Sequence, residues 1–107
     1  PMMIAENGVG VDETLGSDGF VHDDYRIDYQ RRHIMELRNL MEEGTDIFAY
    51  TMWSPFDIVS GNSCEMEKRY GLIYVDIDNE GNGTGKCIPK DSFYWYANMI
   101  ESNGENL

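Results

Sequence analysis

The sequence predicts an α/β fold with parallel strands, and two observations support this prediction. Two short apolar segments, residues 1–6 and 46–53, have the composition of strands in a buried sheet. Apolar residues at helical spacing follow each of them, over residues 24–43 and over residues 89–101. Alternation of strands and helices is typical of parallel α/β architectures, because parallel strands need a long crossover connection.

The first half of the chain contains a strand, a long loop and a helix. The strand, residues 1–6, runs into the turn sequence Glu6-Asn7-Gly8, and residues 8–22 form a loop because four glycines interrupt them. Asp23 and the acid after it favour a helix N-terminus, with Asp23 as the N-cap. Gly44 follows the last periodic residue of the helix, where a left-handed C-cap favours glycine.

The second half contains a strand, a hairpin and a final helix. Residues 46–53 form a near-continuous apolar run with β-branched and aromatic side chains, which is typical of a strand covered on both faces. Residues 68–76 alternate like an exposed strand before a glycine-rich turn, so we expect a hairpin over about residues 68–87. Pro89 suits the first position of the helix at residues 89–101.

The predicted elements form only part of a larger architecture. A (β/α)₈ TIM barrel needs eight strands in about 250 residues, whereas this chain has 107 residues and two βα units with a hairpin insertion. The chain also opens within an apolar run, Pro1-Met2-Met3-Ile4, as if inside a strand. We therefore expect a partial (β/α)₈ barrel, a piece of something larger.

Composition and charge exclude several classes of partner. The chain has 8 Lys+Arg against 20 Asp+Glu, which gives a net charge of −12. Nucleic acids and anionic membrane surfaces are polyanions, so we expect neither as a partner. No apolar run approaches the roughly 18 residues of a membrane span, which indicates a soluble protein. Cys64 and Cys87 lie far apart without metal-ligand spacing, so reduced thiols are favoured over a disulfide.

Three motifs fall at or after the predicted strand ends. Glu6-Asn7-Gly8 ends the first strand, and Trp53-Ser54 followed by Asp57 ends the second. Lys68-Arg69-Tyr70-Gly71 comes later, in the long connection to the last helix. Barrel enzymes place their active sites at the C-terminal ends of the strands, so these motifs are expected to lie together at that end of the barrel.

In this order the motifs resemble those of the glycoside hydrolase family one β-glycosidases. That family shows Glu-Asn-Gly after an apolar run, Asp-x-x-Arg-Ile-x-Tyr before a helix, Trp-Ser-x-x-Asp at a strand end, Lys-Arg-Tyr-Gly on a strand and Ser-x-x-Trp-Tyr on a helix. The chain carries all of them, at residues 6–8, 23–29, 53–57, 68–71 and 92–96. The resemblance covers the chain to about residue 101 and implies the last two βα units of the barrel.

The resemblance implies that Glu6 is the catalytic nucleophile of a retaining glycosidase. A strand-end carboxylate can attack the anomeric carbon and form a glycosyl-enzyme. Retaining chemistry also needs a second carboxyl about 5–5.5 Å away, acting as acid and then as base. In the family this group belongs to an Asn-Glu-Pro motif, which the chain lacks. We therefore expect the chain to be inactive alone.

The resemblance also implies how substrate is bound. Trp53 would form a wall of the sugar subsite, because the apolar C–H faces of sugars stack on aromatic rings, and its peptide bond to Ser54 is often cis in relatives. Family members that act on phosphorylated sugars carry Ser at the place of Ser60, where other members have Glu. Ser60, Lys68 and Tyr70 would hold the 6-phosphate by charge-assisted hydrogen bonds, although Lys68 and Arg69 could instead form a solvated charge pair on an exposed strand.

The leading interpretation is a segment of a bacterial, cytoplasmic 6-phospho-β-glucosidase that uses no cofactor and no metal. The small residue Gly61 favours glucose, because the phospho-galactosidase branch tends to have Trp there. His22 and His33 lack metal-like spacing and are assigned surface or structural roles. The alternatives are a non-catalytic remnant that self-associates through its open strand edges, or a segment of a plain β-glucosidase or a 6-phospho-β-galactosidase. Association with the missing N-terminal part of the barrel is also expected.

Overall fold

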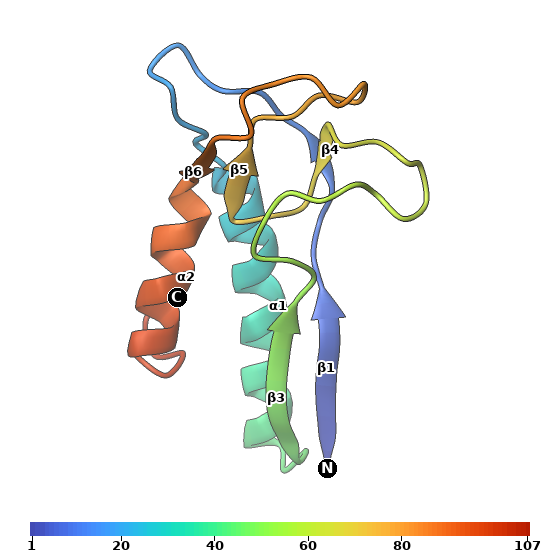
Figure 1. The fold of residues 1–107 in the computed structure, drawn as a ribbon. Coiled ribbons are helices and arrows are strands. Elements are labelled where there is room, and N and C mark those ends of the chain that lie inside the picture. The colour runs from blue at the N-terminus through green and yellow to red at the C-terminus, as the bar shows by residue number, and fades with distance from the viewer.

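Two helices and six short strands make up the protein, and the computed structural model describes all of residues 1–107 (Figure 1). In chain order the elements are β1 (Met2–Asn7), β2 (Val11–Asp12), α1 (Asp24–Glu42), β3 (Ile47–Met52), β4 (Lys68–Arg69), β5 (Ile73–Val75), β6 (Cys87–Pro89) and α2 (Asp91–Glu101). The strands form three two-stranded sheets. The architecture is therefore a partial α/β piece without a closed barrel.

The central sheet pairs β1 with β3 in parallel, as the alternation of strands and helices predicts. Ile4 lies opposite Tyr50 and Asn7 opposite Met52. The amide of Trp53 donates a 3.0 Å hydrogen bond to the carbonyl of Asn7. Both strands therefore end at one edge of the sheet, and the smaller strands and long loops gather beyond that edge (Figure 1).

Helix α1 connects the two parallel strands, and its ends show one expected and one unexpected feature. Gly44 follows the helix with φ 99°, the left-handed conformation expected of a glycine C-cap. Asp23 makes no side-chain cap to its own helix. Its carboxylate instead accepts hydrogen bonds from the backbone amide (2.9 Å) and hydroxyl (2.5 Å) of Ser92 in the first turn of α2. Asp23 thus caps the other helix and ties the two helix starts together.

The region predicted as one hairpin over residues 68–87 contains two separate pairings. β4 pairs antiparallel with β2, whereas β5 pairs antiparallel with β6. The chain changes course at Gly71, where a Cβ atom would lie 2.3 Å from the carbonyl carbon of Phe56. The expectation of an exposed strand is wrong, because Arg69 and Tyr74 are buried. Pro89 ends β6 and does not open the final helix, which starts at Asp91.

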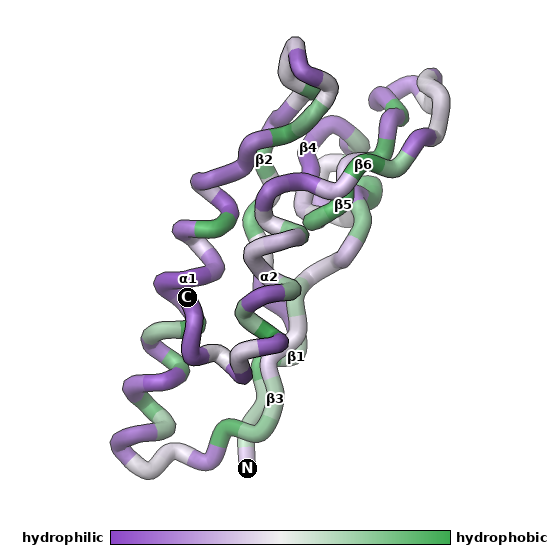
Figure 2. The backbone as a smooth tube through the Cα atoms, turned by 90° about the vertical axis from the view of Figure 1, so that its left-hand side faces the viewer, coloured by the Kyte–Doolittle hydropathy of each residue, from purple (hydrophilic) through white to green (hydrophobic).

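The hydrophobic core is small and lies near the loops rather than around the central sheet. Only 15 of the 107 residues are buried, and the apolar ones among them are Val21, Met66, Leu72, Tyr74 and Met99. Apolar residues run along β1 and β3 (Figure 2), yet Met2 and Phe48 are 55% and 65% exposed. The prediction that these strands are covered on both faces is therefore wrong for this chain by itself, because nothing in the chain packs against the exposed face of the β1–β3 sheet.

The molecule is elongated, with principal extents of 48 × 29 × 18 Å and a radius of gyration of 15.0 Å. A compact domain of this length has a radius of gyration of about 13 Å. None of its helices combines the length and the apolarity required to traverse a lipid bilayer.

Candidate active site

A pocket of about 490 Å³ lies at the C-terminal ends of the two parallel strands. Residues from both strand ends and from the following loops line it: Glu6, Asn7, Gly8, Trp53, Gly61, Asn62 and Tyr70. Among them only Glu6 carries a formal charge. Three of the residues that the motifs single out, Glu6, Trp53 and Tyr70, are thus brought to one cavity.

Trp53 and Tyr70 form the aromatic wall of this pocket. Their ring centroids are 6.3 Å apart and their planes meet at 64°, an edge-to-face arrangement. Two glycines of the first loop allow the backbone to approach these rings. A Cβ atom on Gly8 would lie 2.8 Å from Cβ of Trp53, and one on Gly10 would lie 2.5 Å from Cζ of Tyr70. No peptide bond in the chain is cis, so the cis bond expected between Trp53 and Ser54 is absent.

Asn7, the residue after Glu6, is held by hydrogen bonds to two tyrosines at the edge of the sheet. The side-chain amide of Asn7 donates to the Tyr29 hydroxyl at 3.2 Å, and its oxygen accepts from the Tyr50 hydroxyl at 2.8 Å. The Tyr50 hydroxyl also contacts Gln30. Burial raises the pKa of Tyr50 above its ordinary value of 10, so it stays a neutral donor. These hydrogen bonds hold the end of β1, while the side chain of the neighbouring Glu6 remains exposed to the pocket.

Lys68 lies next to the pocket, and Ser60 lies buried beneath the loop that follows Trp53. The Lys68 ammonium is 6.0 Å from the centroid of the Tyr70 ring, on a strand where alternate residues share a side. Ser60 is only 1% exposed. The Ser63 amide lies 3.4 Å from its hydroxyl oxygen. Neither Lys68 nor Ser60 lines the cavity itself.

A buried network of six charged side chains underlies the loops around the pocket. The acids are Glu13, Asp23 and Asp57, and the bases are Arg26, Arg69 and Lys90. None of these side chains is more than 6% exposed. Three acids facing three bases leave the cluster neutral, which is the condition under which buried charges are tolerated.

Asp57 is the central acid of this network. One carboxylate oxygen accepts from the Lys90 ammonium at 2.8 Å, and the other lies 3.2 Å from Nη1 of Arg69. The same carboxylate accepts the backbone amides of Gly71 (3.0 Å) and Val75 (3.2 Å). Asp57 therefore fixes the chain that follows β4, from Gly71 to the end of β5.

Arg69 points into this network and is only 3% exposed. Its guanidinium also donates to the carbonyls of Glu13, Val75 and Ile77. Because side chains alternate along a strand, burying Arg69 leaves Lys68 and Tyr70 on the other side, next to the pocket. The sequence interpretation of Lys68 and Arg69 as one solvated pair is wrong for Arg69.

Sequence reasoning missed Glu13, Lys90 and Asn62. Glu13 stands in a glycine-rich loop and Lys90 follows a proline, so neither shows a local pattern that indicates burial. Their interaction joins residues 77 positions apart. Asn62 lines the pocket from the loop after Trp53. Arg26 forms a buried ion pair with Asp23 at 2.6 Å.

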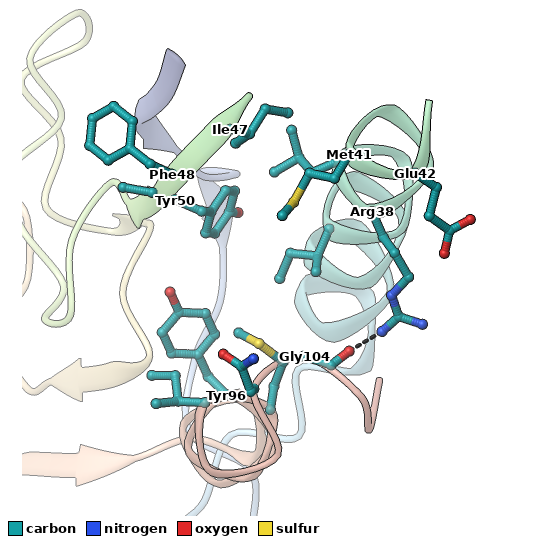
Figure 3. A pocket seen from close by; sticks show the side chains of 14 residues that line it. Arg38, Met41, Glu42, Ile47, Phe48, Tyr50, Tyr96 and Gly104 are labelled. Atoms are coloured by element: carbon teal, nitrogen blue, oxygen red, sulfur yellow. Dashed lines mark hydrogen bonds between the residues drawn. The ribbon is translucent and has the colours of Figure 1, made fainter. Parts of the chain in front are cut away.

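A second, larger cavity of about 610 Å³ lies between α1, β3 and α2 (Figure 3). Met41, Tyr50 and Tyr96 approach it from these three elements. Ten of its 14 lining residues are hydrophobic, and Arg38 and Glu42 are the only charged ones. Such a lining suits packing against apolar groups better than chemistry. In the whole chain, no group of three or more His, Cys, Asp or Glu side chains is placed to hold a metal ion.

Comparison with known proteins is consistent with this arrangement. The family model described as glycosyl hydrolase family 1 matches residues 1–105. The aryl-phospho-β-D-glucosidase BglH of Bacillus subtilis is 50% identical over 107 residues, which are all of this chain and 23% of that protein. The phospho-cellobiase of Klebsiella oxytoca is 46% identical over 107 residues, again all of this chain and 23% of the relative.

A solved structure agrees in fold. The family 1 β-glucosidase from Thermotoga maritima superposes with a TM-score of 0.84 at 39% identity, covering 95% of this chain and 22% of that one. The chain therefore spans about a quarter or less of the length of the proteins it matches.

Proposed function

The chain belongs to glycosyl hydrolase family 1, and on this basis we propose that it is the C-terminal segment of a retaining 6-phospho-β-glucosidase. In this proposal its two βα units are the last two of a (β/α)₈ barrel, and the whole enzyme acts on phosphorylated β-glucosides in the bacterial cytoplasm. The observation that supports it best is the shared pocket of Glu6, Trp53 and Tyr70 at the ends of parallel strands.

Glu6 is the nucleophile in this proposal. Its exposed carboxylate attacks the anomeric carbon while Trp53 stacks against the sugar, and a glycosyl-enzyme forms. A second carboxyl must protonate the leaving oxygen and then activate water. Glu6 is the only acid that lines the pocket. In this proposal the acid/base comes from outside these 107 residues, and the chain alone is inactive.

In this proposal Lys68 and Tyr70 hold the 6-phosphate, and the buried Ser60 contributes by leaving its position free of a carboxylate. The Lys68 ammonium and the Tyr70 hydroxyl are charge-assisted donors for an anion, and Arg69 anchors the strand between them. Ser60 stands where a carboxylate would repel the phosphate. The named activities of BglH and of the phospho-cellobiase favour this substrate class.

The proposal is tested by grafting. The matching segment of BglH is replaced by this chain, and hydrolysis of p-nitrophenyl β-glucoside 6-phosphate is measured beside the unphosphorylated analogue and the galactoside 6-phosphate. We expect turnover of the glucoside 6-phosphate, and a loss of at least about 10³-fold with Glu6→Gln. A properly folded chimera that cleaves only the plain glucoside would overturn the phosphate assignment. A preference for the galactoside 6-phosphate would instead support a segment of a 6-phospho-β-galactosidase.

The alternative is a non-catalytic remnant that associates with itself or with a missing N-terminal part. Exposed Phe48, the open edges of the β1–β3 sheet and the apolar cavity of Figure 3 favour it, because such surfaces promote association. Sedimentation of the isolated chain tests self-association, and the chimera distinguishes a remnant from a competent segment. A remnant would leave the chimera folded but inactive on all three substrates.

A further inference from the structure

We propose that Asn62 is a substrate-contacting residue of the pocket, whose side-chain amide donates a hydrogen bond to the phosphate of a bound 6-phospho-β-glucoside. This inference rests on the proposed function and deepens it by adding a specificity residue. None of the strand-end motifs includes Asn62.

The first argument is the shape of the loop after Trp53. Ser60 closes the base of a short loop, because its amide donates to the Glu65 carbonyl and its carbonyl accepts from the Cys64 amide, both at 2.9 Å. Ser60 is buried at that base, whereas Gly61 and Asn62 form the exposed side of the loop. The loop therefore presents Asn62, not Ser60, to the cavity.

The second argument is the position of Asn62 in the cavity. It lines the same 490 Å³ pocket as Glu6, Trp53 and Tyr70, a volume suited to one small ligand. A sugar stacked on Trp53, with its phosphate near Tyr70 and Lys68, would occupy this space. Asn62 reaches this space from the loop after β3, and Tyr70 reaches it from the position after β4.

The third argument is the chemistry of the side chain. An amide offers two N–H donors without a charge, so it can bind a phosphate oxygen without pairing with the Glu6 carboxylate. A carboxylate at position 62 would instead repel the phosphate, since it would be a second negative charge in a pocket that already holds Glu6. Exchange of Asn62 for Asp, which preserves size, therefore isolates the role of charge.

Titration of the full 107-residue chain by NMR tests the inference, with glucose 6-phosphate and glucose as separate probes. We expect Asn62→Ala to weaken glucose 6-phosphate binding about tenfold, which corresponds to one hydrogen bond to a charged group. Asn62→Asp should weaken it further, and glucose binding should change less than about twofold for either variant. Asn39→Asp is the matched control, because it makes the same charge change on the exposed surface of α1 and should leave both affinities unchanged.

The outcomes separate this inference from the proposed function. If the unaltered chain prefers glucose 6-phosphate and both Asn62 variants bind it equally well, the Asn62 assignment is overturned and the phosphate site stands. An equal loss of both ligands in the variants would show a structural role and would also overturn the assignment. If the unaltered chain shows no preference for the phosphorylated sugar, both proposals fail.

Discussion

The Trp53 and Tyr70 rings meet edge to face with centroids 6.3 Å apart, although the two residues follow strands of different sheets. Trp53 directly follows β3, and Tyr70 directly follows β4. The pair joins the proposed sugar platform to the proposed phosphate site. Its geometry depends on the loop backbone that lies beside both rings.

Gly10→Ala should displace the Tyr70 ring, because the new Cβ would lie 2.5 Å from Cζ of that ring. In a Trp95→Phe background, where Trp53 is the only tryptophan, the fluorescence of Trp53 should change and the thermal midpoint should fall. Gly61→Ala is the control, because a Cβ there meets nothing within 4 Å. Unchanged fluorescence in the Gly10 variant would show that the loop does not hold the ring pair.

Asp57→Asn should destabilise the fold strongly, because it leaves Arg69 without its buried acid and removes one of the two acids that pair with Lys90. Breaking a buried ion pair from one side costs about 3–5 kcal/mol. Urea unfolding followed by circular dichroism measures the change. Asp28→Asn removes the exposed partner of Arg32 and should have little effect, since exposed pairs contribute little. Similar midpoints for the two variants would refute the structural role of the network.

His22 should make stability fall in alkaline solution. Hydrogen bonds to Asp18, first, and to Asp91 raise the pKa of His22 from 6.5 to about 9. A raised folded-state pKa gives a stabilisation that is fully present below 6.5 and is lost as the pH rises through about 9. The same contact lowers the pKa of Asp18 below 3.8, so the stabilisation is also lost in acid.

The measurement is urea unfolding of the native chain and of His22→Gln at a series of pH values. The two proteins should differ most between about pH 4 and pH 6.5 and converge by about pH 10. His33→Gln is the matched control on the exposed surface of α1, and its difference from the native chain should not follow this profile. A difference between native chain and His22→Gln that is constant from pH 6 to pH 10 would contradict the ion pair.

Lys68→Met in the BglH chimera should raise KM for the glucoside 6-phosphate about ten- to a hundredfold, because a hydrogen bond to a charged group is lost. The plain glucoside should be affected little. Lys86→Met removes an exposed lysine that does not line the pocket and serves as the control. Equal KM changes for both substrates would exclude Lys68 from phosphate binding.

Parts of this structure follow from the sequence because local patterns specify them. Apolar runs and helical spacing predict the strand and helix order, and Gly44 predicts the helix end. The ordered motifs predict that Glu6, Trp53 and Tyr70 come together, since parallel strands end at one edge. These features depend on residues close in sequence or on a shared strand direction.

Other features depend on distant residues and could not be predicted. Asp23 resembles a cap for its own helix, but it caps α2 through Ser92, which is 69 positions away. Lys90 is buried only because Glu13 and Asp57 converge on it. The exposure of Phe48 has a different cause: its pattern suits a covered sheet, but no element among these 107 residues covers it. A sequence pattern indicates the environment that a segment requires, but it does not show whether the chain itself provides that environment.

Trapping the glycosyl-enzyme tests the central claim most directly. The BglH chimera is treated with a 2-deoxy-2-fluoro-β-glucosyl fluoride bearing a 6-phosphate, which slows hydrolysis of the covalent intermediate, and its peptides are analysed by mass spectrometry. The account predicts one added fluoro-glucosyl phosphate on the peptide that contains Glu6, and no label in Glu6→Gln. A label on another carboxylate, or labelling by the unphosphorylated reagent alone, would contradict it.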